Sequence, residues 1–252
     1  MFGLPADIVI LLAFAIFMGG IAKGISGVAL PIVTLSIALN FVEPRTGLAA
    51  IILSIVVTNV WQAFGARNIL IPVRRFWFMA IVFLIFLYTG SLLATRVESW
   101  VLFLVIGGAA IVFTATQFYK PDAPPLTPRT EKIVGPIVGV IAGLMGGMTV
   151  VWGPPIMMFL FLLRADKEMW VASISFLYLL GSVPLALFYY DNGILADDML
   201  WLSAAACIPA MAGIMIGERI RRYINEALFR KVLLIIIFVG GLNMIRRAFM
   251  SI

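Results

Sequence analysis

Two apolar stretches of this 252-residue chain are much longer than a single membrane crossing requires. The first runs from Ile8 to Leu39 with Lys23 as its single charged residue, and the second runs from Ile133 to Leu163 without a charge. A bilayer core is spanned by about 20 helical residues. Because 63% of all residues are hydrophobic and the mean hydropathy is +1.12, the sequence predicts an all-α polytopic membrane protein.

Clustered glycines followed by proline interrupt each stretch near its middle. The sequence reads GGIAKGISGVALP from Gly19 to Pro31 and GVIAGLMGGMTVVWGPP from Gly139 to Pro155. Glycine and proline are the residues least able to continue a helix. We therefore expect two broken, re-entrant hairpins, each made of a half-helix, a glycine turn and a returning half-helix. Irregular backbone at membrane depth needs a surrounding of protein or a water-filled cavity, so these turns are the first candidates for a substrate site.

Three further apolar segments follow each hairpin and predict three transmembrane helices per half. They are residues 47–64, 76–94 and 100–118, and then 169–190, 199–217 and 227–245. A proline-rich charged segment, residues 120–132, separates a first transmembrane repeat, 1–119, from a second, 133–252. Internal repeats of this kind are common in transporters.

The two halves can be aligned with one another. Pro31 and Pro155 lie 124 residues apart, and the same offset pairs Trp77 with Trp201. The glycine clusters match at another offset, 119 residues, which pairs Gly24 with Gly143 and Gly27 with Gly146. The second turn is therefore expected to contain about five extra residues, and an internal duplication is predicted.

The distribution of lysine and arginine predicts how the halves are oriented. If each long stretch returns to its own side, 13 basic residues gather on one side, in segments 67–75, 120–132, 164–167 and 219–231, and four remain on the other. If each stretch crosses once, the basic residues divide 8 to 9. The positive-inside rule favours the hairpins. The halves are then inverted repeats with outside termini and a cytoplasmic linker, and the hairpin tips meet near the midplane.

The residue types that are absent narrow the function. The chain has no histidine and one cysteine, Cys207, so it lacks the commonest general base and any cysteine-based metal site. Ser26 lies in Gly-Ile-Ser-Gly rather than in a G-x-S-x-G elbow. We therefore expect no enzyme, cofactor or metal. The basic residues are scattered among the spans, which argues against a nucleic-acid partner, and the expected partners are a small anionic substrate and the lipid bilayer.

Both turns have the chemistry of an anion site. A half-helix that begins after a glycine turn has free N–H groups and a positive dipole end, and glycine permits close approach of an oxyanion. Lys23 favours an anion over a cation, although a lysine that snorkels to the membrane face is the alternative. The glycines have the alternative role of close helix packing. The predicted substrate-binding residues are Lys23, Gly24, Ser26, Gly27, Pro31, Thr58, Asn59, Gln62, Gly143, Gly146, Gly147, Thr149, Trp152, Pro154, Pro155 and Ser182.

The paired turns GISGVALP and GLMGGMTVVWGPP, in a duplicated hydrophobic chain, resemble the sulfite exporter TauE/SafE family, also called the TSUP anion transporters. The resemblance covers essentially the whole chain. It implies a multi-pass permease of the bacterial inner membrane that exports sulfite, a sulfonate such as sulfoacetate, or a related small anion. Ser26 replaces a glycine that the family pattern has in the first turn, which leaves the substrate open.

Several alternatives to this function stay open. The chain is also compatible with a permease for another small organic anion, or with a non-transporting membrane scaffold or assembly protein. With no histidine and few buried carboxylates, no obvious proton carrier is present, so a uniporter driven by substrate and voltage competes with coupling to an ion. A homodimer is also left open.

Overall fold

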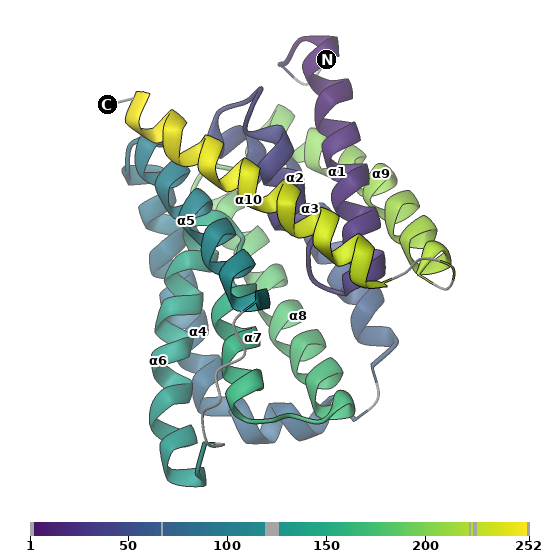
Figure 1. The fold of residues 1–252 in the computed structure, drawn as a ribbon. Helices are drawn as coiled ribbons and strands as arrows, with labels where there is room; N and C mark the ends of the chain where they lie inside the picture. The colour runs from purple at the N-terminus through teal and green to yellow at the C-terminus, as the bar shows by residue number, and fades with distance from the viewer. Residues whose placement is uncertain (1–2, 67, 119–125, 222, 224–225, 251–252) are drawn as a thin grey trace.

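The computed structural model describes residues 3–66, 68–118, 126–221, 223 and 226–250, and these ranges contain ten α-helices and no strand (Figure 1). The helices are α1 (Ala6–Ser26), α2 (Leu30–Ala38), α3 (Pro44–Phe64), α4 (Leu70–Arg96), α5 (Ser99–Phe118), α6 (Pro128–Thr149), α7 (Gly153–Leu162), α8 (Lys167–Asp191), α9 (Asp198–Ile220) and α10 (Glu226–Met250). In the described part of the chain, seven helices are long and apolar enough to cross a membrane. The protein is therefore an all-α, multi-pass membrane protein, as predicted.

The six predicted spans between and after the hairpins all correspond to helices, namely α3, α4, α5, α8, α9 and α10. One difference lies at the start of α4. The predicted basic loop is already helical from Leu70 onward, and a kink at Phe76 (φ −107°, ψ 16°) separates this first turn from the rest of the helix. Helix α6 begins at Pro128, within the predicted linker 120–132, and residues 120–125 lie outside the described ranges.

The first hairpin breaks at Gly27. This residue caps α1 in the left-handed region (φ 84°, ψ −11°), a conformation that glycine adopts without steric cost. The hydroxyl of Ser26 accepts hydrogen bonds from the N–H groups of Val28 and Ala29, both at 3.3 Å. Pro31, at the second position of α2, fits a first helical turn, where its missing N–H has no partner to lose.

The second hairpin breaks in the same way at Val150. This residue caps α6 in the left-handed region (φ 55°, ψ 14°), and α7 begins three residues later at Gly153. A β-branched residue in this region is strained, because its side chain crowds the backbone. Val150 is only 1% exposed, so the surrounding packing holds the strained conformation.

The arms of each hairpin are unequal, which corrects the prediction of two half-helices. The entering helices α1 and α6 contain 21 and 22 residues and are long enough to cross a membrane, whereas the returning helices α2 and α7 contain 9 and 10. The clustered glycines lie mostly inside the helices, since Gly24 and Gly147 are within α1 and α6. The first break falls at Gly27, a glycine of the first cluster, whereas the second falls at Val150, after the glycines of the second cluster.

Close helix packing explains the glycines within α1 and α6. A Cβ added at Gly24 would lie 2.4 Å from the carbonyl oxygen of Ile214 in α9, and a Cβ at Gly147 would lie 2.2 Å from the carbonyl oxygen of Leu87 in α4. Such contacts are possible only between backbones without intervening side chains. A single offset of 123 residues therefore relates Gly24 to Gly147 and the capping residue Gly27 to Val150. The predicted pairing of the glycines at 119, with extra residues in the second turn, was wrong.

The halves pack on one another reciprocally. Helix α1 packs on α9 and α6 packs on α4, while α2 contacts α10 and α7 contacts α5. The central contacts are α3 with α8 and α5 with α10. In Figure 1, α1 runs from the top of the molecule toward its centre, α6 runs up from the bottom, and both termini lie at the top. This arrangement agrees with inverted repeats, whose orientation across a membrane stays a prediction, as does the division into repeats at residues 119 and 133.

Candidate functional site

A buried lysine lies beside the first helix break. Lys23, in the last turn of α1, is 5% exposed. Its Nζ donates a hydrogen bond of 3.0 Å to the Oγ1 of Thr58 and another to the Oδ1 of Asn59, both in α3. The sequence predicted all three as site residues, and the structure brings them together. Snorkelling does not describe Lys23, because its amino group points to buried partners.

Both partners of Lys23 are held by further hydrogen bonds. The Thr58 hydroxyl donates to the carbonyl oxygen of Ile55 at 3.1 Å, and the Asn59 Nδ2 donates to the carbonyl oxygen of Tyr178 in α8 at 3.1 Å. The Asn59 Nδ2 and the Thr58 hydroxyl hydrogen thus point to backbone carbonyls, and acceptor oxygens of both side chains face the lysine. The network also links α1 and α3 of the first half to α8 of the second.

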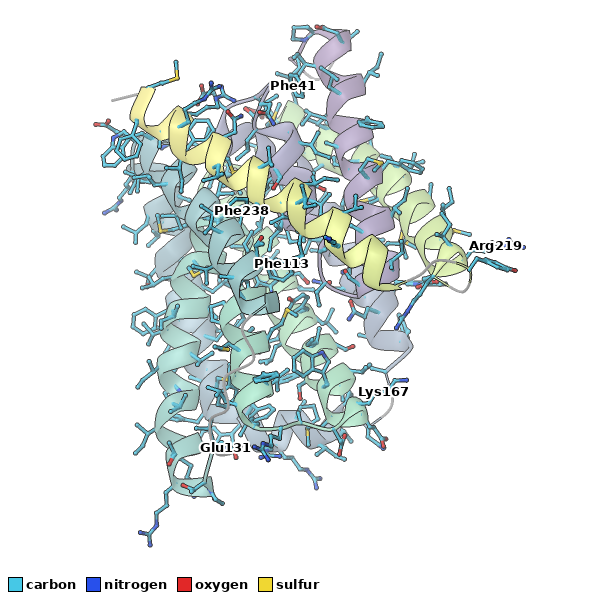
Figure 2. The ribbon with its side chains drawn as sticks, in the orientation of Figure 1. Phe41, Phe113, Glu131, Lys167, Arg219 and Phe238 are labelled. Carbon is cyan, nitrogen blue, oxygen red and sulfur yellow. The ribbon has the colours of Figure 1, made fainter. Side chains whose placement is uncertain are left out.

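A narrow gap lies between the two helix breaks. Lys23, Val28, Pro31 and Asn59 line it from the first half, and Val150, Trp152, Gly153 and Tyr178 line it from the second. Phe113, near the centre of Figure 2, also contributes to it. The volume of about 10 Å³ is close to the minimum that holds one water molecule. The two breaks therefore face each other across a nearly closed space.

Trp152, which lines this gap, has an unsatisfied donor in its indole ring. The residue is 2% exposed, and its Nε1 has no hydrogen-bond partner in the described structure. Its ring packs edge-on against Phe83 and Tyr178, with centroids 6.3 and 5.8 Å away. An unpaired buried N–H is costly, so this indole is a candidate donor to a ligand that enters the gap.

A larger cavity of about 520 Å³, here called the vestibule, begins at Lys23 on the other side. Thr58, Gln62, Ser26 and Gly27 line its inner part. Its outer part is lined by charged residues from the ends of α8 and α9: Lys167, Glu218 and Arg221. Trp61 donates from Nε1 to the Glu218 carboxylate at 3.4 Å. The vestibule thus connects the surface to the amino group of Lys23, whereas the gap beyond is shut.

The predicted site residues divide into two groups. Those that line the gap or the vestibule are Lys23, Gly24, Ser26, Gly27, Pro31, Thr58, Asn59, Gln62 and Trp152. Those that the structure does not place among the lining residues of either cavity are Gly143, Gly146, Gly147, Thr149, Pro154, Pro155 and Ser182. The first group contains most of the predicted side chains with polar atoms.

Structural roles account for the second group. Gly143 and Gly147 contact the backbone of α4, and a Cβ at Gly146 would lie 2.9 Å from the Trp152 ring. The Thr149 hydroxyl bonds within its own helix end, and that of Ser182 bonds to the Leu179 carbonyl oxygen at 3.2 Å.

Prolines reduce the number of donors at the second break. The first helical positions lack intrahelical N–H partners, but Pro154 and Pro155 have no N–H to offer. Helix α7 therefore presents the N–H of Gly153 at its start, and α2 presents those of Leu30 and Ile32 on either side of Pro31. The anion cradle expected from two helix ends is smaller than the sequence suggested.

Sequence reasoning missed the outer part of the vestibule. Trp61 lies near the end of the predicted span 47–64, and Lys167 and Arg221 lie in the basic segments 164–167 and 219–231, where aromatic and charged residues are common. One available signal was Glu218, near the end of α9. It is an acidic residue directly before the basic segment 219–231, where it has no evident role in topology. Their convergence depends on how α3, α8 and α9 pack.

A multi-pass helical protein with two opposed helix breaks, a buried lysine and a vestibule leading to it has the features of a membrane transporter. The family model described as Sulfite exporter TauE/SafE matches residues 12–244 of the chain. The protein therefore belongs to the TauE/SafE sulfite exporter family, a family of membrane transporters. No curated protein and no solved structure matches the chain significantly.

Proposed function

We propose that the protein exports a small sulfur-containing anion, such as sulfite or the sulfonate sulfoacetate, across the bacterial inner membrane. The observation that carries this proposal is the amino group of Lys23, which lies between the vestibule and the gap with neutral oxygen partners. The ion pair between Arg75 and Glu131, found among the described residues, lies elsewhere and does not involve Lys23. A buried ammonium needs a counterion, and a substrate anion supplies one.

In this proposal the anion enters the vestibule and binds between the two breaks. Lys23 donates to it from the first half, and the unpaired Nε1 of Trp152 donates from the second. The gap is too small for the anion as it stands, so binding requires the breaks to separate. The two bundles then move relative to one another around the anion, and the vestibule side closes.

The vestibule opens among the ends of α3, α8 and α9, on the side whose loops carry most of the basic residues. The positive-inside rule makes this the cytoplasmic side. The described conformation then accepts a substrate from the cytoplasm, which suits an exporter. Catalysis has no part in the proposal, and neither a metal nor a cofactor is needed.

Two measurements test the proposal. Purified protein is screened in a thermal-shift assay with sulfite, thiosulfate, sulfoacetate and taurine, and flux of each stabilising anion is then followed in proteoliposomes. We expect at least one anion to stabilise the protein and to cross the bilayer. Lys23→Ala should lose binding by at least about tenfold, because a hydrogen bond to a charged group contributes roughly 1.5–3 kcal/mol.

The same assay separates the competing functions. Acetate and succinate serve as carboxylate controls. A preference for them would show that the substrate is another small organic anion and not a sulfur-containing one. A membrane scaffold gives neither stabilisation nor flux with any solute. Unchanged anion affinity in Lys23→Ala would remove Lys23 from the site.

A further inference from the structure

The hydrogen-bond geometry around Lys23 suggests how transport is coupled, given the proposed function. The Thr58 hydroxyl hydrogen and the Asn59 Nδ2 point to backbone carbonyl oxygens, so the two fixed partners of Nζ are both acceptors. The orientation of the Asn59 amide is fixed by the same network, because the carbonyl oxygen of Tyr178 requires its NH₂ group.

Two acceptors are the number that a neutral amine can satisfy. A neutral amine has two N–H groups and one lone pair, whereas an ammonium has three N–H groups and no lone pair. Two N–H groups are directed to Thr58 and Asn59, so the third position of Nζ is available to a ligand in the cavities that Lys23 lines. That position holds either a lone pair, in the amine, or an N–H that donates a hydrogen bond to an anion, in the ammonium.

The groups around Lys23 make its favoured protonation state depend on whether an anion is bound. The side chains that contact its amino group from α3 are neutral, α2 contains no titratable residue, and α8 faces it with Tyr178. Glu218 and Arg221 of α9 and Lys167 of α8 line the vestibule that leads to it. Without an anion, a buried ammonium with neutral partners is disfavoured relative to the amine. With an anion, the ammonium is favoured.

We propose that Lys23 takes up one proton from water when the anion binds and returns it when the anion leaves, so that each anion is carried together with a proton. The proton forms the third N–H bond on the Nζ lone pair, and that N–H donates to the anion. The anion itself gains no proton, and no electron is transferred. Lys23 then serves as the proton carrier in a chain that has no histidine.

The experiment measures anion affinity as a function of pH. Thiosulfate and sulfoacetate are the probes, because sulfite itself takes up protons near neutral pH. We expect the dissociation constant of the wild-type protein to rise about tenfold per pH unit in the alkaline range, as required when one proton binds with one ligand. Lys23→Arg should bind with an affinity that is independent of pH, because a guanidinium stays charged.

Two control variants exclude other titrating groups. Lys231→Arg changes an exposed lysine of α10 and should keep the wild-type pH slope. Glu218→Gln removes the vestibule carboxylate and should also keep the slope, whatever its affinity. If either variant abolished the slope, the proton would belong to that residue and the proposal for Lys23 would be overturned.

A second measurement does not depend on any variant. Proton uptake is recorded with a pH indicator when anion is added to wild-type protein in weakly buffered detergent solution, and acidification is recorded during flux into proteoliposomes loaded with a pH dye. We expect about one proton per anion in the alkaline range. Binding with pH-independent affinity and no proton uptake would overturn this inference alone. Absence of anion binding at every pH would overturn the proposed function and this inference with it.

Discussion

Ser26 and Thr149 have the same role at the ends of α1 and α6, 123 residues apart. The Ser26 hydroxyl donates to the Ala22 carbonyl oxygen at 2.7 Å, and the Thr149 hydroxyl donates to the Met145 carbonyl oxygen at 2.6 Å. Each hydroxyl oxygen also accepts, at 3.3 Å, from the N–H two residues later. One hydroxyl thus satisfies both a helix-end carbonyl and a donor of the break, where regular helical bonds end.

Removing these hydroxyls should destabilise the breaks. We expect Thr149→Val to lower the unfolding free energy by about 1–3 kcal/mol, because the N–H of buried Val151 loses its acceptor. Ser26→Ala should cost less, since Ser26 is exposed to the vestibule. Thermal denaturation in detergent measures both. The control is Thr89→Val, an exposed residue whose hydroxyl bonds to the Ile85 carbonyl oxygen. Equal losses in Thr89→Val and Thr149→Val would contradict the capping role.

The second prediction concerns the glycine contacts between the halves. Gly24→Ala and Gly147→Ala should each lower stability by about 1–3 kcal/mol, because the new methyl group would push α1 from α9 or α6 from α4. Gly108→Ala in α5 is the matched control, since no atom lies within 4 Å of its Cβ position. There the better helix propensity of alanine should stabilise by up to about 1 kcal/mol. Melting temperatures that did not distinguish Gly108 from Gly24 and Gly147 would rule out tight helix crossings.

The glycines also show where sequence reasoning reached its limit. Apolar length, glycine and proline predicted two hairpins and six further spans, and the helices agree with these segments. The same reasoning placed both breaks at the glycine clusters, which is right for Gly27 and wrong for Val150. A glycine within a helix costs only about 1 kcal/mol relative to alanine, which close packing offsets. Only the partner backbones of α4 and α9 decide that Gly147 and Gly24 stay helical, and those partners are distant in sequence.

The site was predictable in its polar residues but not in their connections. Lys23, Thr58, Asn59 and Trp152 were recognisable because polar groups inside apolar spans are costly and need a reason. Which polar groups form hydrogen bonds with one another depends on how α1, α3 and α8 are aligned against each other. The sequence could not show that Thr58 and Asn59 both bind Lys23, or that Trp152 is left without an acceptor.

The third prediction is the membrane topology. Both termini lie at the same end of the molecule in Figure 1, and Glu131 and Lys167 lie at the opposite end in Figure 2. The excess of basic residues near that opposite end makes it cytoplasmic. A phosphatase reporter fused after the C-terminus should therefore be active, and a fluorescent reporter that requires the cytoplasm should be dark. Reporters inserted in segment 120–132 should give the reverse pattern. A cytoplasmic C-terminus would overturn the inverted hairpins.

The fourth prediction replaces the substrate anion by an internal one. Asn59→Asp places a carboxylate beside the amino group of Lys23, which then needs no external counterion. We expect anion affinity to fall at least about tenfold, while the folded protein is retained. Asn59→Ala is the control, because it also loses the hydrogen bond to the Tyr178 carbonyl oxygen but adds no charge. Titration of both variants with the anion that stabilises wild-type protein gives the comparison. Equal affinities in the two would show that the charge of Lys23 does not recognise the anion.

The fifth prediction separates a binding role of Trp152 from a packing role. Trp152→Phe keeps an aromatic ring against Phe83 and Tyr178 but removes the Nε1 donor. Because that donor has no partner within the described protein, its removal should leave the melting temperature of the empty protein nearly unchanged or slightly higher.

Anion binding should respond differently to the same change. If the indole N–H donates to the substrate when the breaks separate, affinity should fall about tenfold or more, as for loss of a hydrogen bond to a charged acceptor. Trp61→Phe is the matched control, since the Trp61 Nε1 already donates to Glu218 at the outer vestibule. A Trp152 variant that melted at a lower temperature but bound the anion normally would make the indole a packing residue and would remove its Nε1 from the proposed anion donors.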